Sequence, residues 1–99
     1  MFKELTDKNF EEETSKGLKL VDFYTNWCKF CKNQQEVLEQ LDDNFWIGKL
    51  DCDKYPDIAR KYGIVGFPSF LVFKEGKLKT QFSGYHTKSQ LLNKLTNVI

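Results

Sequence analysis

The chain has 99 residues, of which 40% are hydrophobic and 15% aromatic, enough for one compact core and too few for two domains of ordinary size. Fifteen Lys and Arg against fourteen Asp and Glu leave a net charge of +1, so no strong field points to nucleic acid, a membrane surface or an acidic substrate. No apolar segment resembles a secretory signal or approaches the ~18 residues of a membrane span. We therefore expect one domain over residues 1–99, cytoplasmic, binding neither nucleic acid nor membrane.

The N-terminal half predicts alternating helices and strands. A short helix is predicted to begin at Thr6-Asp7 and to end near Gly17, where a residue without a Cβ atom suits a left-handed cap. Residues 20–24 are nearly all apolar, which is typical of a strand covered on both faces. From about Cys28 to Leu41 the apolar residues follow helical spacing, and a second strand is predicted over roughly Phe45 to Cys52.

The C-terminal half predicts a helix, a hairpin and a final helix. Pro56 suits the first turn of a short helix. Residues 70–73 and 78–82 are predicted to pair as antiparallel strands, joined by a turn at Glu75-Gly76. Residues 87–90, Thr-Lys-Ser-Gln, match a capping box that starts the last helix. The predicted class is α/β, with a central mixed sheet of four to five strands flanked by about four helices.

Residues 27–31, Trp-Cys-Lys-Phe-Cys, lie where a predicted strand ends and a helix begins. A thiol in the first helical turn faces unpaired backbone N–H groups and the positive end of the helix dipole, and both favour the thiolate that attacks disulfides. Two intervening residues place the sulfurs close enough to bond to each other. We expect Cys28 to be the more exposed thiol and to attack a disulfide, and Cys31 to resolve the mixed disulfide.

A metal site is the alternative use of a C-x-x-C pair. Three cysteines, an odd number, argue against a framework of structural disulfides. Zinc normally takes four ligands, and the remaining Cys52 and His86 lack the spacing of a second half-site, so we predict no metal. Cys52 lies in an apolar strand and is expected to be an inert buried thiol, whereas His86 is expected to be a solvated turn residue.

Three separated segments resemble the thioredoxin family in order and spacing. They are V-D-F-Y-x-x-W-C-x-x-C-K from residue 21, K-L-D-x-D from residue 49 and Y-G-I-x-G-F-P-S-F from residue 62. The resemblance covers nearly the whole chain and implies the thioredoxin fold. It also implies a protein-disulfide reductase without a bound cofactor, which acts on disulfide-containing proteins and takes electrons from NADPH through a separate thioredoxin reductase.

The resemblance implies roles for further residues. Asp22 matches the buried acid behind the active site, and Lys49 matches the lysine near that acid. Burial would raise the pKa of Asp22 and let it handle the proton of Cys31. Trp27 matches the aromatic residue that shields the cysteines, and the loop at residues 66–68 matches the one whose proline is cis. The substrate-binding residues so implied or expected are Trp27, Lys29, Phe30, Gly66, Phe67, Pro68 and Gly84.

Two departures from the family pattern are visible. Thioredoxins usually have Gly-Pro between the cysteines, where this chain has Lys29-Phe30, and often a proline at the position of Glu36. Without that proline, the helix is expected to run straighter. The positive charge of Lys29 beside Cys28 predicts a protein somewhat more oxidising than a typical thioredoxin, but still a reductase.

Three functions are compatible with these observations. The first is a general protein-disulfide reductase, expected to be a monomer. The second is a glutaredoxin-like, glutathione-dependent reductase, but Gly66-Phe67 before the proline differs from the Thr-Val of glutaredoxins. The third is a non-catalytic docking subunit with the same fold, against which stand both cysteines, Asp22 and Trp27.

Overall fold

A computed structural model describes residues 2–99, which form a five-stranded sheet in the order β1-β3-β2-β4-β5. The elements along the chain are β1 (Lys3–Leu5), α1 (Phe10–Glu13), β2 (Leu18–Tyr24), α2 (Lys29–Leu41), β3 (Trp46–Asp51), α3 (Pro56–Lys61), β4 (Ser69–Lys74), β5 (Lys77–Ser83) and α4 (Lys88–Thr96). β1, β3 and β2 are parallel, while β4 is antiparallel to both β2 and β5. The predicted α/β class with a mixed sheet is thereby confirmed.

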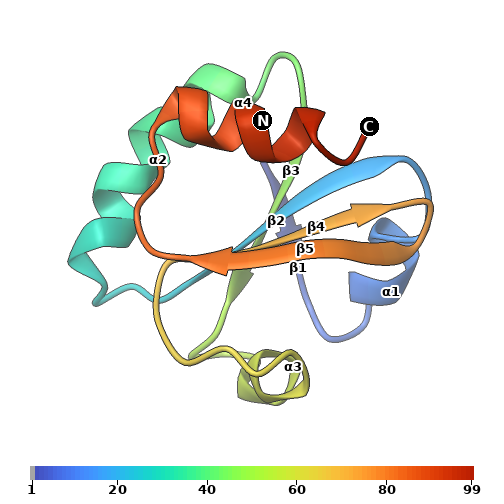
Figure 1. Cartoon of the computed structure of the whole chain (residues 1–99). Helices are drawn as coiled ribbons and strands as arrows, with labels where there is room; N and C mark the ends of the chain where they lie inside the picture. The colour runs from blue at the N-terminus through green and yellow to red at the C-terminus, as the bar shows by residue number, and fades with distance from the viewer. Residues whose placement is uncertain (1) are drawn as a thin grey trace.

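Helices cover both faces of the sheet (Figure 1): α2 and α4 lie on one side, and α1 and α3 on the other. Side chains alternate between the faces along each strand. In β2, Val21 and Phe23 belong to the core beneath α1 and α3, whereas Leu20 belongs to the core beneath α2 and α4. Asp22 follows the parity of Leu20 and therefore lies on the face that α2 covers.

The N-terminus differs from the sequence prediction. Strand β1 precedes the first helix and pairs with β3, and the helix expected from Thr6-Asp7 is confined to Phe10–Glu13. The Thr6 hydroxyl accepts hydrogen bonds from the backbone N–H groups of Lys8 and Asn9, and the Asn9 side chain accepts one from the Thr6 N–H at 2.7 Å. These local side-chain bonds hold a turn where a helix would otherwise start.

Several local predictions are confirmed. Glu75 and Gly76 both have positive φ, 50° and 82°, as a tight hairpin turn requires. Pro56 opens α3, and Thr87 and Gln90 form both hydrogen bonds of a capping box. The Phe67–Pro68 peptide bond is cis, as the resemblance implies.

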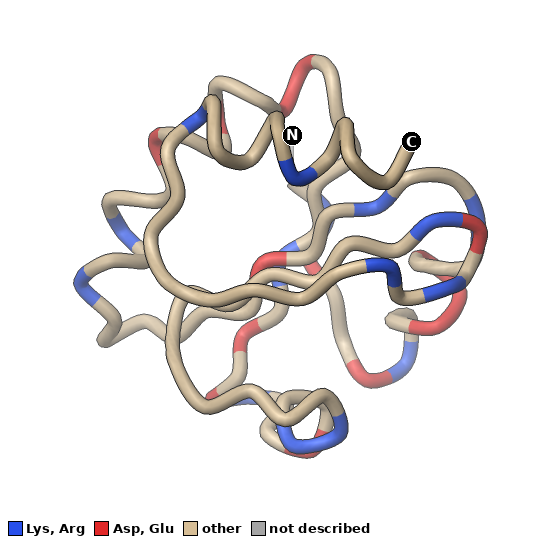
Figure 2. Tube along the Cα trace, viewed as in Figure 1, with Lys and Arg blue, Asp and Glu red and all other residues tan. Residues whose placement is uncertain are grey.

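Charged residues are dispersed over the fold. Figure 2 shows basic and acidic positions interspersed along the trace, rather than each sign gathered on its own face. This distribution accords with the net charge of +1. No helix among residues 2–99 is long and apolar enough to cross a membrane.

Candidate active site

The site is centred on a disulfide between Cys28 and Cys31 at the start of α2, with Cα atoms 5.3 Å apart. Cys28 is the N-cap of α2 and has extended φ and ψ of −82° and 115°. Its Sγ accepts a hydrogen bond from the Cys31 N–H at 3.2 Å. An N-terminal N–H group aimed at this sulfur, together with the helix dipole, stabilises a thiolate on Cys28 after reduction.

The expected difference in exposure between the two cysteines is wrong for this structure. Cys28 and Cys31 are each 6% exposed. The disulfide ties the sulfur of Cys28 back onto the first turn of α2, where the Cys31 N–H also holds it. The two cysteines therefore have the same exposure to solvent. What distinguishes Cys28 is its place at the N-terminus of α2.

Trp27 stands next to the disulfide and is 71% exposed. Its ring packs edge-on against Phe67 at a centroid distance of 5.9 Å, and its Nε1–H donates to Asp53 Oδ1 at 3.4 Å. Gly84, directly after β5, is joined to the loop that contains Phe67 and Pro68, because its N–H donates to the Pro68 carbonyl at 2.8 Å. The structure thus brings Trp27, Phe67, Pro68 and Gly84 into one connected group.

Asp22 is buried beneath this region, at 1% exposure. Neither carboxyl oxygen receives a hydrogen bond from any protein group in residues 2–99. Burial, opposed in part by the charge of Lys49, raises the pKa of Asp22 from 3.8 to about 7. A carboxyl group in this state can exchange a proton near neutral pH.

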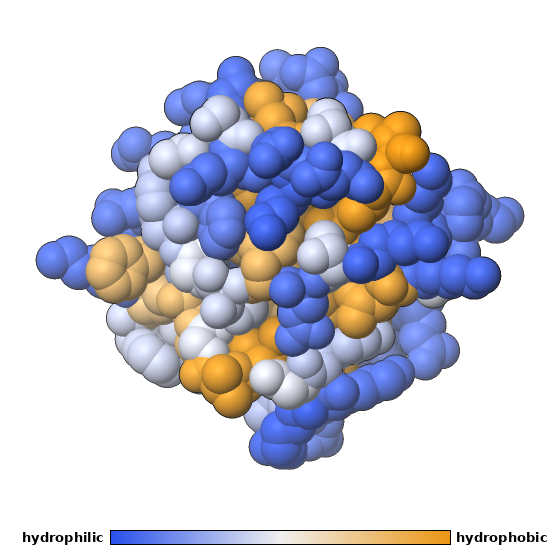
Figure 3. All heavy atoms as spheres, in the orientation of Figure 1, coloured by the Kyte–Doolittle hydropathy of each residue, from blue (hydrophilic) through white to orange (hydrophobic). Residues whose placement is uncertain are grey.

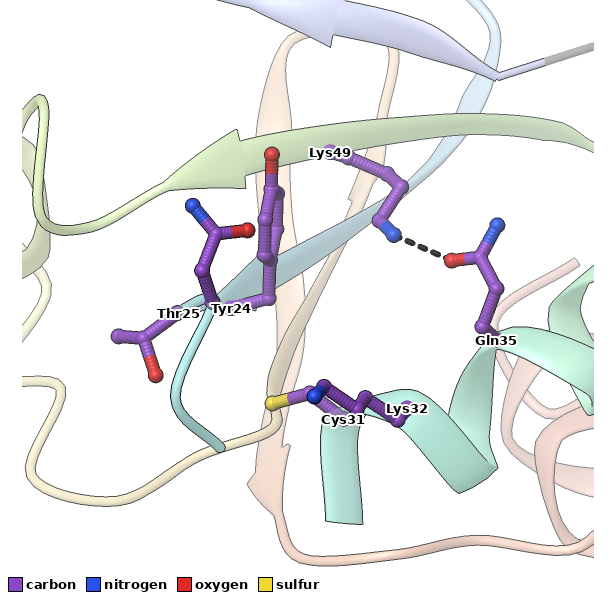
Figure 4. Close-up of a pocket in the computed structure, with 7 residues that line it drawn as sticks. Tyr24, Thr25, Cys31, Lys32, Gln35 and Lys49 are labelled. Carbon is purple, nitrogen blue, oxygen red and sulfur yellow. Dashed lines mark hydrogen bonds between the residues drawn. The ribbon is translucent and has the colours of Figure 1, made fainter. Parts of the chain in front are cut away.

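Lys49 lies opposite Asp22 in the register of β2 and β3 and therefore on the same face. Its ammonium donates a hydrogen bond to Gln35 of α2 and lies 4.5 Å from the centre of the Tyr24 ring. Figure 4 shows Lys49 reaching from β3 toward Gln35. The lysine acts on Asp22 through its charge, without a direct hydrogen bond.

A cavity of about 230 Å³ opens beside Cys31, and its lining residues are Tyr24, Thr25, Asn26, Cys31, Lys32, Gln35 and Lys49. In Figure 4 the Cys31 sulfur points toward the chain that leaves β2. Lys32 and Lys49 are the charged residues of this lining, and both are basic. Solvent can therefore approach Cys31 from the side of Lys49.

The remaining predicted binding residues lie around the disulfide. Lys29 is exposed at the start of α2, and Gly66 is half-buried in the loop before Pro68. Phe30 is 58% exposed and lines a second cavity, together with Tyr85. An exposed aromatic residue therefore directly precedes each cysteine, Trp27 before Cys28 and Phe30 before Cys31.

His86 is not the solvated turn residue that was predicted. Its ring packs 4.7 Å from Phe82 and 6.0 Å from Phe70, and its Nδ1 lies 2.7 Å from the Gly84 carbonyl oxygen. The Gln34 side chain holds the His86 backbone with two hydrogen bonds of 2.8 Å. The residue is half-buried rather than solvated, because the buried Gln34 side chain of α2 ties its loop to the helix.

Cys52 lies away from the disulfide, in the core under α1 and α3. It is buried, and burial raises the pKa of its thiol to about 12, so it stays protonated and unreactive at neutral pH. Among residues 2–99, no three His, Cys, Asp or Glu side chains are grouped to hold a metal ion.

Three contributors to the site were not predicted: Gln34, Gln35 and Asp53. Asp53 belongs to the K-L-D-x-D segment, which could have drawn attention to it, but its bond to Trp27 spans 26 residues. The two glutamines are adjacent polar residues in a helix, and no sequence signal distinguishes them from solvent-exposed ones. Gln34 is in fact fully buried.

A reactive disulfide at the N-terminus of a helix, next to a central strand that carries a buried acid, defines a thiol–disulfide oxidoreductase. The Thioredoxin family profile matches residues 1–97. Thioredoxin of Listeria monocytogenes is 37% identical over 95 residues, which is 92% of each chain. Thioredoxin of Bacillus subtilis is 40% identical over 90 residues, covering 87% of this chain and 86% of that one.

A plant relative, the chloroplastic thioredoxin Y2 of Arabidopsis thaliana, is 42% identical over 82 residues, covering 79% of this chain and 49% of that protein. The chain belongs to the thioredoxin family. It has the thioredoxin fold and is a protein-disulfide oxidoreductase whose redox group is its own cysteine pair.

Proposed function

We propose that this protein reduces disulfide bonds in other proteins with electrons that it receives from NADPH through a thioredoxin reductase. The observation that carries the proposal is the position of Cys28 at the N-terminus of α2, where its sulfur accepts a hydrogen bond from the Cys31 N–H. This position favours a thiolate in the reduced protein. Residues 1–99 are proposed to act as one domain.

Cys28 is proposed as the nucleophile. Its thiolate attacks one sulfur of the substrate disulfide, and a bond forms between the two sulfurs while the substrate disulfide breaks. The displaced substrate sulfur leaves as a thiolate and takes up a proton. The Cys31 thiolate then attacks the Cys28 sulfur and releases the second substrate thiolate. Two electrons have passed to the substrate, and the Cys28–Cys31 disulfide has formed.

Asp22 is proposed to accept the proton of Cys31 during resolution. It lies on the sheet face that α2 covers, and its pKa of about 7 suits exchange near neutral pH. Lys49, held by Gln35, is proposed to keep the ionised form of Asp22 accessible through its positive charge. Both residues act behind the disulfide rather than on the substrate.

The substrate is proposed to lie across the exposed residues around the disulfide. Trp27 and Phe67 supply an aromatic surface, and Gly66 and Gly84 leave the backbone accessible on either side of Pro68. Lys29 and Phe30 extend the surface along the start of α2. A shallow surface of this kind accommodates many different protein disulfides.

We further propose that the protein is a cytoplasmic monomer. The dithiol stays reduced only in a compartment that keeps thiols reduced, and in cells the cytoplasm does so. Figures 2 and 3 show that charges are dispersed and that apolar patches are separated from one another. Such a surface supports a monomer that binds its partners transiently.

The test is an insulin-reduction assay with two electron supplies. With NADPH and thioredoxin reductase, we expect rapid precipitation of the insulin B chain. With glutathione and glutathione reductase, we expect little reduction. Preference for glutathione would support the glutaredoxin-like alternative. If the protein accelerates insulin reduction neither with the two enzyme supplies nor with dithiothreitol, the docking subunit would be supported. The Cys28→Ser variant is the control for chemistry at this site.

A further inference from the structure

A second cavity lies along α2, with a volume of about 360 Å³, and its lining residues are Phe30, Asn33, Glu36 and Tyr85. Phe30, Asn33 and Glu36 come from α2, and Tyr85 comes from the loop between β5 and α4. Phe30 directly precedes Cys31 in the sequence, so the cavity begins next to the disulfide. In Figure 3 an apolar patch lies over the beginning of α2.

The walls of this cavity are aromatic and open to solvent. Phe30 is 58% exposed and Tyr85 is 44% exposed. More than half of the Phe30 surface is therefore in contact with solvent, and an aromatic ring gains free energy when a partner covers it. The faces of aromatic rings attract cations, because the π electrons concentrate negative charge there.

The polar lining points to the same kind of ligand. Glu36 is an exposed carboxylate that forms no ion pair with any of residues 2–99, and Asn33 adds an amide oxygen as a further acceptor. Two aromatic walls beside an available carboxylate match the requirements of a long cationic side chain. An acidic side chain would be repelled, and a short apolar one would leave Glu36 without a partner.

The neighbouring lysines do not fill this cavity. Lys32 is one helical turn before Glu36, but it lines the other cavity, together with Lys49. Lys29 is exposed and is not among the residues that line either cavity. The basic and the acidic lining therefore lie in two different cavities, both bordered by α2.

We propose that the cavity between Phe30 and Tyr85 binds a cationic side chain of the substrate, arginine in particular, close to the disulfide that is being reduced. A guanidinium group can stack on the aromatic rings and at the same time pair with Glu36. The inference rests on the proposed function and adds a substrate preference to it: disulfides with an adjacent basic residue are reduced faster.

The experiment compares disulfide-bonded peptides that carry either arginine or citrulline, a neutral side chain of nearly the same shape. The residue is placed one, two or three positions from the attacked cysteine, and kcat/KM is measured with NADPH and thioredoxin reductase. At one position or more, we expect the arginine peptide to react about two- to fivefold faster at low salt, as for an exposed charge pair. In 0.5 M salt the ratio should approach one.

Glu36→Gln is the test variant, and Glu39→Gln, an exposed carboxylate on the same helix outside the cavity, is the matched control. The arginine preference should disappear in the first and persist in the second. Tyr85→Ala should also reduce it. Equal rates for both peptides at every position, or an equal preference in both glutamine variants, would overturn the inference. If the protein reduces both peptides at the same rate, only this inference is rejected. If it reduces neither peptide, the proposed function is rejected together with the inference.

Discussion

Asp22 and Lys49 face each other across β2 and β3, yet the ammonium group of Lys49 is hydrogen-bonded to Gln35 rather than to the Asp22 carboxyl. A direct ion pair would stabilise the charged carboxylate and hold its pKa low. With the lysine directed to α2, desolvation dominates and the pKa rises to about 7. The buried acid can then take or release a proton near neutral pH.

Asp22→Asn should make the protein more stable at alkaline pH. The folded pKa is about 7 and the ordinary value is 3.8, so the native state binds the proton more tightly than the unfolded chain does. Below pH 3.8 the acid is protonated in both states and costs nothing. As the pH rises toward 7 the wild-type protein loses stability, and above 7 the loss is complete.

Urea unfolding from pH 4 to pH 9 checks this expectation. The variant should gain roughly 2–4 kcal/mol over the wild type at pH 8, from ~1.4 kcal/mol for each pKa unit, and almost nothing at pH 4. Glu39→Gln, which changes an exposed carboxylate, should show no such trend. A constant difference at all pH values would contradict a raised pKa for Asp22.

Asp22→Asn should slow resolution more than the initial attack. The amide cannot accept the Cys31 proton, and loss of a general base typically costs on the order of a hundredfold in rate. Stopped-flow measurement of tryptophan fluorescence, to which Trp27 next to the disulfide contributes, separates formation of the mixed disulfide from its resolution. Equal slowing of the two steps would remove Asp22 from the proton transfer.

Cys31→Ser should accumulate a mixed disulfide through Cys28. The helix N-terminus favours the Cys28 thiolate, and the serine cannot complete the second step. Mass spectrometry of tryptic peptides after incubation with a disulfide substrate identifies the linked residue. Attachment at Cys52 would contradict the assignment, although its burial and high pKa argue strongly against this outcome.

Lys29→Gln should make the protein a stronger reductant. The positive charge of Lys29 favours the Cys28 thiolate, so it stabilises the reduced form, and its removal lowers the potential. An exposed charge interaction of ~0.2–1 kcal/mol corresponds to about 5–20 mV. Equilibration with glutathione measures the midpoint of each protein.

For the wild-type protein, the midpoint should lie between about −270 and −180 mV and nearer the lower value. Lys32→Gln is the matched control, because Lys32 follows the second cysteine rather than the first. A wild-type midpoint at or above −180 mV would favour an oxidase over a reductase. An equal shift in both variants would show a general charge effect.

The sequence alone was sufficient for the order of the elements and for the reactive pair. Continuous apolar strands, a helical stripe after Cys28, a turn at Glu75-Gly76 and the Thr87 capping box depend on residues close in the chain, so local interactions determine them. The cysteine spacing and the strand–helix boundary are local features as well. A fifth strand was left open by the prediction of four to five strands, but it could not be placed, because three residues carry no periodicity and gain their structure by pairing with β3.

Only the tertiary structure decided which distant residues meet at the site. The Trp27–Asp53 bond spans 26 residues, and the Gln34 bonds to His86 span 52. Such contacts depend on the sheet register and on the placement of α2 over the sheet, which no short segment encodes. The same packing directs Lys49 to Gln35 and sets the pKa of Asp22, because the free energy of a buried charge depends on its whole surroundings rather than on its neighbours in sequence.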